Sequence, residues 1–356
     1  MAVVLEFGLA LVAILAAAYL FTNAVEMLGG RLELGQGAVG SVLAAVGTAL
    51  PETMIPVVAI LGAALAGGDT GVAGEIGVGA ILGAPFLLAT LAMFVVGASA
   101  YGFRKRREHG AEVRCRQEKV DFPWCRVSAK DVTVDEETIA RDVLFFLIFF
   151  AIAAAVGIVA LPFFVKVAVA VLLVAAYAYY VRRALASGGA LEDVPERLTL
   201  WRFGSRPPTW AVAGQLILAL GLIVAGAQVF VGAVEVSSEA IGLPAGLVAL
   251  VLAPLATELP EKLNSLIWVR DGKDTLALGN ITGAMVFQST IPVILGILFT
   301  PWVLGPLNLF SAALALVSGA LIYLALRRDG PLHSWQLMIG GLFYLAFLVG
   351  AVYSIV

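Results

Sequence analysis

A short phrase containing proline and glutamate occurs twice in this chain, each time inside a long apolar stretch. Residues 48–52 read T-A-L-P-E and residues 257–261 read T-E-L-P-E, a separation of 209 positions (257 − 48 = 209). Because the segments around them are apolar, nothing but the repeated phrase itself accounts for carboxylates at Glu52 and Glu261. A charged side chain at the centre of a bilayer costs about 2.5–3.5 kcal/mol on insertion scales, so such residues usually face the protein interior and take part in function.

The chemistry that these residues could perform is the binding of a hard cation. Thr48 and Thr257 place a hydroxyl one turn before each glutamate. The prolines lack an N–H group, so we expect them to break the helices and free carbonyl oxygens at membrane depth. Carboxylates, hydroxyls and carbonyls are the oxygen ligands that Ca²⁺ prefers. The same set also suits two sodium ions or two protons. The structural alternative is a helix kink with a paired acid, but such a kink would not need two copies of the phrase in register.

Composition predicts that membrane-spanning helices position these residues. Of the 356 residues, 61% are hydrophobic and only 13% are charged, while soluble proteins are about a quarter charged. Many apolar stretches approach the roughly 20 residues that span a bilayer. We predict an all-α polytopic membrane protein whose first segment is a span and not a cleaved signal peptide. The predicted spans are 3–28, 37–66, 72–101, 141–160, 162–186, 208–236, 244–269, 274–299, 303–326 and 334–355.

The positive charges indicate how these spans are oriented. Of 22 Lys and Arg residues, only Lys166 and Lys262 fall outside one set of alternate connections. The positive-inside rule makes that side the cytoplasm. The sequence therefore predicts a multi-pass protein of the cell (inner or plasma) membrane, with both termini extracytoplasmic and with loops 102–140 and 187–207 cytoplasmic.

The duplicated phrase and the ten spans together predict two inverted repeats of five spans. Repeat one covers residues 1–187 with the 102–140 loop, a linker covers 188–207, and repeat two covers 208–356. Inverted repeats place a binding site near the bilayer midplane. The repeat continues beyond the phrase, because G-A-I-L-G-A at 79–84 matches G-N-I-T-G-A at 279–284 (279 − 79 = 200). The glycine pairs Gly79–Gly83 and Gly279–Gly283 predict close helix packing.

These motifs resemble the sodium/calcium exchanger family of the calcium:cation antiporter superfamily. The resemblance is carried by G-T-A-L-P-E at 47–52, A-T-E-L-P-E at 256–261 and the two G-x-x-x-G-A segments, and it suggests a ten-helix member of prokaryotic type. It implies alternating-access exchange of a cytoplasmic cation, usually calcium, against sodium or protons. It also implies that Glu52 and Glu261 are the paired ion ligands, with Thr48 and Thr257 beside them.

The predicted site departs from the family pattern. The serine that follows the family's threonine is replaced by Ala49 in one repeat and by Glu258 in the other. On the third and eighth spans, the family's serine and its Asn or Asp are replaced as well, by Ala84, Leu88, Ala284 and Gln288. The polar groups are thus concentrated in repeat two, where we expect Glu258 and Gln288 to join the metal site.

Glu258 and Lys262 stand four residues apart in the order that favours an ion pair on a helix. Two interpretations stay open: a structural pair, or a pair in which one member titrates, because desolvated Lys and Glu shift their protonation readily. The second interpretation leans toward proton coupling. The candidate modulators of the site are Lys262, Asn280, Glu26 and Glu235.

We expect a secondary antiporter that exports calcium or another divalent cation in exchange for sodium or protons. Two alternatives stay open. One is a proton-coupled exchanger of a different metal or of sodium, and the other is a non-transporting membrane sensor, which the lost ligands on spans three and eight favour. An enzyme is not expected, because no nucleophile–base constellation or nucleotide-binding loop is present.

The expected partners are membrane lipid and inorganic cations, without nucleic acid and without a cofactor beyond the transported ions. His109, Cys115 and Cys125 in the 102–140 loop lack the Cys-x-x-Cys spacing of a zinc site. We therefore expect a solvated loop with free thiols and no disulfide framework.

Overall fold

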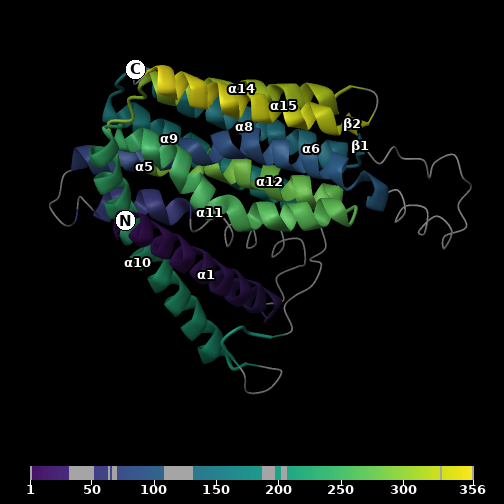
Figure 1. Cartoon of the computed structure of the whole chain (residues 1–356), viewed down its shortest axis with the longest axis horizontal. Coiled ribbons are helices and arrows are strands. Elements are labelled where there is room, and N and C mark those ends of the chain that lie inside the picture. The colour runs from purple at the N-terminus through teal and green to yellow at the C-terminus, as the bar shows by residue number, and fades with distance from the viewer. Residues whose placement is uncertain are drawn as a thin grey trace, which may run out of the picture. The chain divides into compact units, whose positions relative to one another are not determined.

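The computed structural model describes residues 2–31, 52–62, 65, 70–107, 131–186, 197–201, 207–328 and 331–354 (Figure 1). Within this part of the chain, eight helical segments are long and apolar enough to cross a membrane. Two shorter apolar helices, Glu52–Gly62 and Ala245–Leu255, fall within predicted spans two and seven. The described helices therefore follow the order of the ten predicted spans.

Most predicted spans correspond to one regular helix, and the second, third and eighth depart from it. Residues 52–57 are helical and continue into a π-helical turn. The elements in chain order are α1 (Ala2–Arg31), η2 (Val58–Gly62), α5 (Thr70–Leu87), η3 (Leu88–Ala92), α6 (Met93–Gly102), β1 (Asp131–Val132), α8 (Glu136–Val156), α9 (Phe163–Ala186), α10 (Thr209–Ile241), α11 (Ala245–Arg270), α12 (Asp274–Gln288), α13 (Ile291–Phe299), α14 (Pro306–Leu326), β2 (Leu332–His333) and α15 (Ser334–Tyr353).

Local sequence signals fix several helix ends. Asp135 precedes α8, and its carboxylate accepts the backbone N–H of Thr138 at 3.4 Å and the Thr138 hydroxyl at 2.8 Å. This capping starts the helix at Glu136, five residues before the predicted span, because hydropathy alone treats the charged first turn as loop. At the other end of a span, α10 stops at Gly242, which adopts a left-handed backbone with φ 68°.

The seventh span is one continuous helix, so the predicted break at Pro260 is wrong. α11 runs through both Pro254 and Pro260 without interruption. A proline removes a single backbone donor, and a helix packed among neighbours tolerates this as a local irregularity. The corresponding Pro51 lies outside the described residues.

Backbone irregularity is found instead in the second span, at η2, and in the third and eighth spans. In the eighth, α12 ends at Gln288 and α13 begins at Ile291. In the third, the π-helical η3 joins α5 to α6. The hydroxyl of Thr90 donates to the carbonyl of Phe86 at 2.5 Å, and Ser318 of α14 donates to that of Ala89 at 2.6 Å. These bonds satisfy carbonyls where the regular helical pattern is interrupted, and π turns of this kind are frequent at functional sites.

The described chain forms two compact units, each drawing on both halves of the sequence. Unit 1 comprises Met1–Ala84, Val156–Glu258 and Phe287–Val303. Within it, α1 lies along α10 (Figure 1). The rings of Phe7 and Phe230 are 4.9 Å apart, and Gln215 of α10 donates to the carbonyl of Leu20 at 2.8 Å.

Close packing between α5 and α11 in unit 1 depends on glycine. A Cβ atom added at Gly79 would lie 2.1 Å from the carbonyl oxygen of Gly246, and one at Gly83 would lie 2.2 Å from that of Leu250. Pro254 cannot donate to the Leu250 carbonyl, so Gly83 approaches a carbonyl that has no helical donor. The predicted packing role is thus confirmed for the first glycine pair. Among the described residues, a Cβ at Gly279 would meet only the end of the Ile139 side chain, at 3.9 Å.

Unit 2 comprises Pro85–Ala155, Leu259–Val286 and Leu304–Val356. Helices α14 and α15 lie side by side, shown in yellow in Figure 1. α15 also packs against α6 and η3, since a Cβ at Gly340 would lie 2.4 Å from the Thr90 carbonyl oxygen. Unit 2 is therefore a helical bundle that holds the π-helical turn from two sides.

Strands β1 and β2 close one end of unit 2. They pair antiparallel, with Asp131 opposite His333, and Nδ1 of His333 lies 2.7 Å from Oδ1 of Asp131. Arg107 binds the carbonyl of Asp131 at 3.1 Å and the carboxylate of Asp274 at 2.5 Å. In the nearby turn after α11, the hydrogen bond from Arg270 lowers the pKa of Asp271.

Candidate cation-binding site

Glu52 occupies the first described position after the proline of the repeated phrase. Its side chain is only 7% exposed. One turn later, Ile55 enters an apolar cluster of unit 1 that includes Ile76 of α5 and Ala253 of α11. The cluster also contains Ile14 of α1 and Phe230 of α10. Packing against four other helices, α1, α5, α10 and α11, therefore holds the segment that begins with Glu52.

Thr257 and Glu258 follow the same cluster on α11. They come one turn after Ala253, and their side chains are 4% and 2% exposed. The Thr257 hydroxyl donates its proton to the Ala253 carbonyl at 3.0 Å. Its oxygen lone pairs consequently remain available as acceptors or ligands. Two buried carboxylates, Glu52 and Glu258, thus extend from one apolar cluster of unit 1.

Burial limits what these carboxylates can do. A buried carboxylate must be neutralised by a cation, by hydrogen-bonded partners or by a proton, because transfer of the isolated ion from water is very costly. A cation and a proton can replace one another at such a group. The arrangement is therefore suited to ion exchange.

A polar break between α12 and α13 lies in the same unit. Gln288, the last residue of α12, is 2% exposed, and the neighbouring Ser289 and Thr290 are fully buried. The Thr290 hydroxyl donates to the Phe287 carbonyl at 3.0 Å. Carbonyl groups at the end of a half-helix carry partial negative charge and suit cations. Gln288 was predicted for the site, whereas Ser289 and Thr290 were not.

One signal in the sequence could have found Thr290. Thr90 and Thr290 are separated by the same 200 positions as the glycine motifs (290 − 90 = 200). Each donates its hydroxyl to a carbonyl of the preceding turn, at the interruption of its own span. Extending the repeat alignment past the glycines would have identified this pair.

The structure describes some of the other predicted site residues and leaves the rest outside its described part. Asn280 in α12 and Glu235 in α10 are half-buried, and Leu88 and Ala84 are buried apolar residues. The side chains of Glu26, Glu261 and Lys262 lie outside the described part, although their backbones are in α1 and α11. Thr48, His109 and both cysteines are outside it altogether. Their predicted roles stay predictions.

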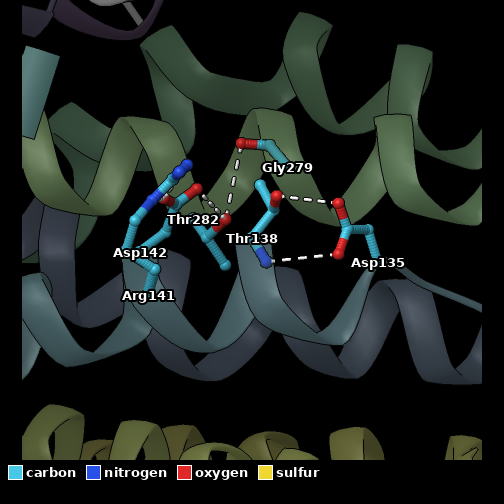
Figure 2. Close-up of polar contacts among 6 residues, drawn as sticks. All are labelled: Asp135, Thr138, Arg141, Asp142, Gly279 and Thr282. Carbon is cyan, nitrogen blue, oxygen red and sulfur yellow. Dashed lines mark hydrogen bonds and ion pairs between the residues drawn. The ribbon is translucent and has the colours of Figure 1, made fainter. Parts of the chain in front are cut away.

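Sequence analysis missed one intramembrane acid. Asp142 of α8 is 4% exposed, and Figure 2 shows it facing Thr282 of α12. Its Oδ2 accepts the Thr282 hydroxyl at 3.2 Å, while Oδ1 receives Nη2 of Arg141 at 3.1 Å. The predicted span began at Arg141, so Asp142 was only its second residue and was not considered. Starting the helix at Glu136 places it inside a candidate span.

Metal-binding clusters of the usual kind are not seen in the described ranges. No group of three or more His, Cys, Asp and Glu side chains that could hold a metal ion occurs there. The candidate site instead combines two carboxylates with hydroxyl, amide and carbonyl oxygens. Such mixed oxygen sets suit calcium and sodium better than zinc.

Ten apolar helical segments, a duplicated acidic phrase and interrupted spans define a polytopic ion transporter built from inverted repeats. The chain belongs to the sodium/calcium exchanger family, whose profile, described as sodium/calcium exchanger protein, matches residues 2–186 and 211–356.

Two curated relatives match part of the chain. CaxA of Alkalimonas amylolytica is 32% identical over 40% of this chain and 44% of its own length. The sodium/calcium exchanger MaX1 of Methanosarcina acetivorans is 31% identical over 38% of this chain and 39% of its own length. The matched segment thus spans less than half of either relative.

Solved structures show the same fold at low sequence identity. A crystal structure of the H⁺/Ca²⁺ exchanger CAX is 18% identical, covers 99% of this chain and 84% of its own, and has a TM-score of 0.72. The sodium-calcium exchanger NCX_Mj is 20% identical, covers 98% of this chain and 97% of its own, and has a TM-score of 0.57. The chain accordingly has the ten-helix inverted-repeat fold of these exchangers.

Proposed function

We propose that this protein is a secondary active antiporter that exports calcium, or another divalent cation, in exchange for sodium or protons. The observation that carries the proposal is the burial of Glu52 and Glu258 beside one apolar cluster of unit 1. Membership of the exchanger family supports it. The names of the similar proteins, which include H⁺/Ca²⁺ and sodium/calcium exchangers, support calcium as the cargo.

In the proposed mechanism, Glu52 and Glu261 bind the cation. Thr48, Thr257 and backbone carbonyls complete the oxygen shell, and Glu258 and Gln288 tune it. Release of the ion leaves buried carboxylates that must take up the counter-ion before access changes, which couples the two fluxes. We place both termini outside the cell membrane and the 102–140 loop in the cytoplasm, as the positive charges predict.

The site is tested by calcium uptake into proteoliposomes. Glu52→Gln and Glu261→Gln remove one charge each while keeping side-chain size, and each should reduce gradient-driven uptake at least about tenfold, equivalent to roughly 1.4 kcal/mol. Glu239→Gln is the matched control, because Glu239 is an exposed acid of α10 in the same unit. Normal uptake in both site variants, with the protein folded, would contradict the proposed ligands.

A second candidate is proton coupling, possible with calcium, with another metal or with sodium as cargo. Glu258 favours it, because a buried carboxylate stands where the family pattern has serine. Uptake is measured with a pH gradient in sodium-free buffer, and separately with a sodium gradient at fixed pH. Proton coupling predicts uptake in the first condition that Glu258→Ser abolishes. Uptake driven only by sodium would exclude this candidate.

A further inference from the structure

His333, the residue before α15, has two contacts that need different protonation of its imidazole ring. Its Nδ1 lies 2.7 Å from Oδ1 of Asp131, on the strand that pairs with its own (Figure 1). Its side chain also accepts the backbone N–H of Gln336, in the first turn of α15, as the N-cap of that helix. A carboxylate requires an N–H group on the ring, whereas a backbone N–H requires a bare ring nitrogen.

A proton added to the ring decides between these two contacts. Neutral imidazole has one N–H group and one bare nitrogen, so it can accept from Gln336. The imidazolium ion has two N–H groups and no acceptor. Protonation of His333 therefore ends the side-chain cap on α15 and makes the contact with Asp131 a charge-assisted hydrogen bond. Water can deliver the proton, because the His333 side chain is 45% exposed.

Histidine is the side-chain type in this region that changes its charge near neutral pH. Arg107 binds Asp131 at the backbone carbonyl, at 3.1 Å, whereas the carboxylate of Asp131 faces His333. The helices packed against β1 and β2, and α15 itself, carry or lead into basic residues 104–106, Arg327 and Arg328, and they contain Tyr101, Tyr323, Tyr344 and Tyr353. Lys130 and Asp329 adjoin the strands in sequence. None of these other side-chain types ordinarily titrates near neutral pH.

The two strands connect this pair to two long helices of unit 2. Just after β1, the backbone N–H of Thr133 donates to the carboxylate of Asp274 at 2.9 Å, and that of Asp135 donates to the hydroxyl of Thr275 at 3.1 Å. β1 is thereby bound to the first turn of α12. β2 leads directly into α15, which packs on the π-helical turn of the third span. A change at the contact between the strands therefore reaches both α12 and α15.

We propose that His333 and Asp131 form a pH switch on the predicted cytoplasmic side, in which protonation of His333 exchanges the cap of α15 for an ion pair with β1. At low pH the end of the 102–140 loop is then held more firmly to β2, while the first turn of α15 is less well capped. The effect on transport rests on the proposed ion exchange. The change of hydrogen-bond partners does not depend on it.

The chain offers a matched set of variants. His333→Asn keeps a good N-cap acceptor but cannot become charged, so it fixes α15 in the capped form at every pH. Asp131→Asn removes the charge from the other member of the pair and keeps its size. His109 is the other of the two histidines in the sequence, so His109→Asn is the control for loss of a histidine elsewhere.

The direct test is hydrogen–deuterium exchange of the full-length protein in lipid nanodiscs, at about pH 8 and about pH 5.5, on either side of the usual titration of histidine. Exchange is divided by the intrinsic rate at each pH. Protection of the first turn of α15 should fall about fivefold at the lower pH in the unaltered protein and in His109→Asn, because the cap is lost. It should not fall in His333→Asn. Equal protection at both pH values in the unaltered protein, or an equal fall in His333→Asn, would overturn the proposal.

The strands give the complementary readout in the same experiment. Protection of β1 and β2 should rise at the lower pH in the unaltered protein, because the ion pair forms. The rise should be absent in both Asp131→Asn and His333→Asn. A rise of the same size in Asp131→Asn would show that this carboxylate is not the partner of the protonated ring, and the proposed switch would be rejected.

Transport is measured separately, as calcium uptake into proteoliposomes across the same pH range. His333→Asn should flatten the part of the pH profile that coincides with the change in protection, and His109→Asn should leave it unchanged. An unaltered profile in His333→Asn would overturn the coupling of the switch to transport. If the proposed exchange itself failed, uptake would be absent in every protein while the pH-dependent protection of α15 persisted.

Discussion

At the scale of single residues, the hydrogen-bond partners of Lys166 explain why a basic residue lies outside the predicted cytoplasmic connections. It is one of two basic residues that the sequence analysis placed away from the cytoplasmic connections. Its Nζ donates to the carbonyls of Thr300 at 2.9 Å and Pro301 at 2.8 Å, just after the end of α13. The next residue, the buried Trp302, has a φ of 48°, which is unusual for a bulky side chain. Lys166 therefore stabilises a strained turn and satisfies carbonyls that the helix end leaves open.

Replacement of this lysine should destabilise the turn. Lys166→Met keeps most of the aliphatic side chain but removes both charged hydrogen bonds, each of which contributes about 1.5–3 kcal/mol. We expect a lower midpoint of thermal unfolding in detergent. Lys105→Met is the control, because Lys105 is exposed. Equal midpoints for the two variants would show that the two carbonyl contacts do not stabilise the protein.

At the scale of elements, interruptions of helices are found where hydrogen bonding to neighbours permits them. The sequence placed a break at Pro260, yet α11 is continuous there, while α12 and α13 are separated at Ser289 and Thr290, with Pro292 in the first turn of α13. Thr290 and Ser318 explain the difference, since their hydroxyls satisfy carbonyls at the irregular turns. Proline marks a missing backbone donor, but the alternative donors come both from the same span, as with Thr290, and from another helix, as with Ser318.

Glycine substitution tests the packing of α5 on α11. Gly79→Ala would bring a methyl group to 2.1 Å from a backbone carbonyl, which must move, so we expect a loss of about 1–3 kcal/mol in stability. Gly74→Ala on the same helix meets nothing within 4 Å and should stabilise the helix by about 0.5–1 kcal/mol. The comparison is made by thermal unfolding in one detergent. Equal effects of the two changes would contradict close packing.

At the scale of the whole molecule, the compact units do not follow the order of the sequence. Unit 1 and unit 2 each contain segments from before residue 187 and after residue 208. Contacts such as Arg107–Asp274 and Asp131–His333 join parts of unit 2 that are far apart in the chain. The two predicted repeats divide the chain by its sequence, whereas helix packing decides which segments belong to the same compact unit.

The predicted orientation is tested with the two natural cysteines. In intact cells, a membrane-impermeant thiol reagent should label Cys115 and Cys125 only after permeabilisation, because loop 102–140 is predicted to be cytoplasmic. In a variant with both changed to serine, Ser354→Cys should be labelled without permeabilisation, since residue 354 is exposed beyond α15. The opposite labelling pattern would invert the proposed topology.

The sequence by itself determined the class of protein, the order of the spans and the exchanger family, because apolar length and a duplicated motif are local, countable properties. It also identified Glu52, Thr257, Glu258 and Gln288, all of which are buried in unit 1. Only the tertiary structure revealed the contact of Asp142 with Thr282, the burial of Ser289 and Thr290, and the continuity of α11. The contact of Asp142 with Thr282 joins residues 140 positions apart, and burial likewise depends on which segments pack together, so neither follows from spacing along the chain.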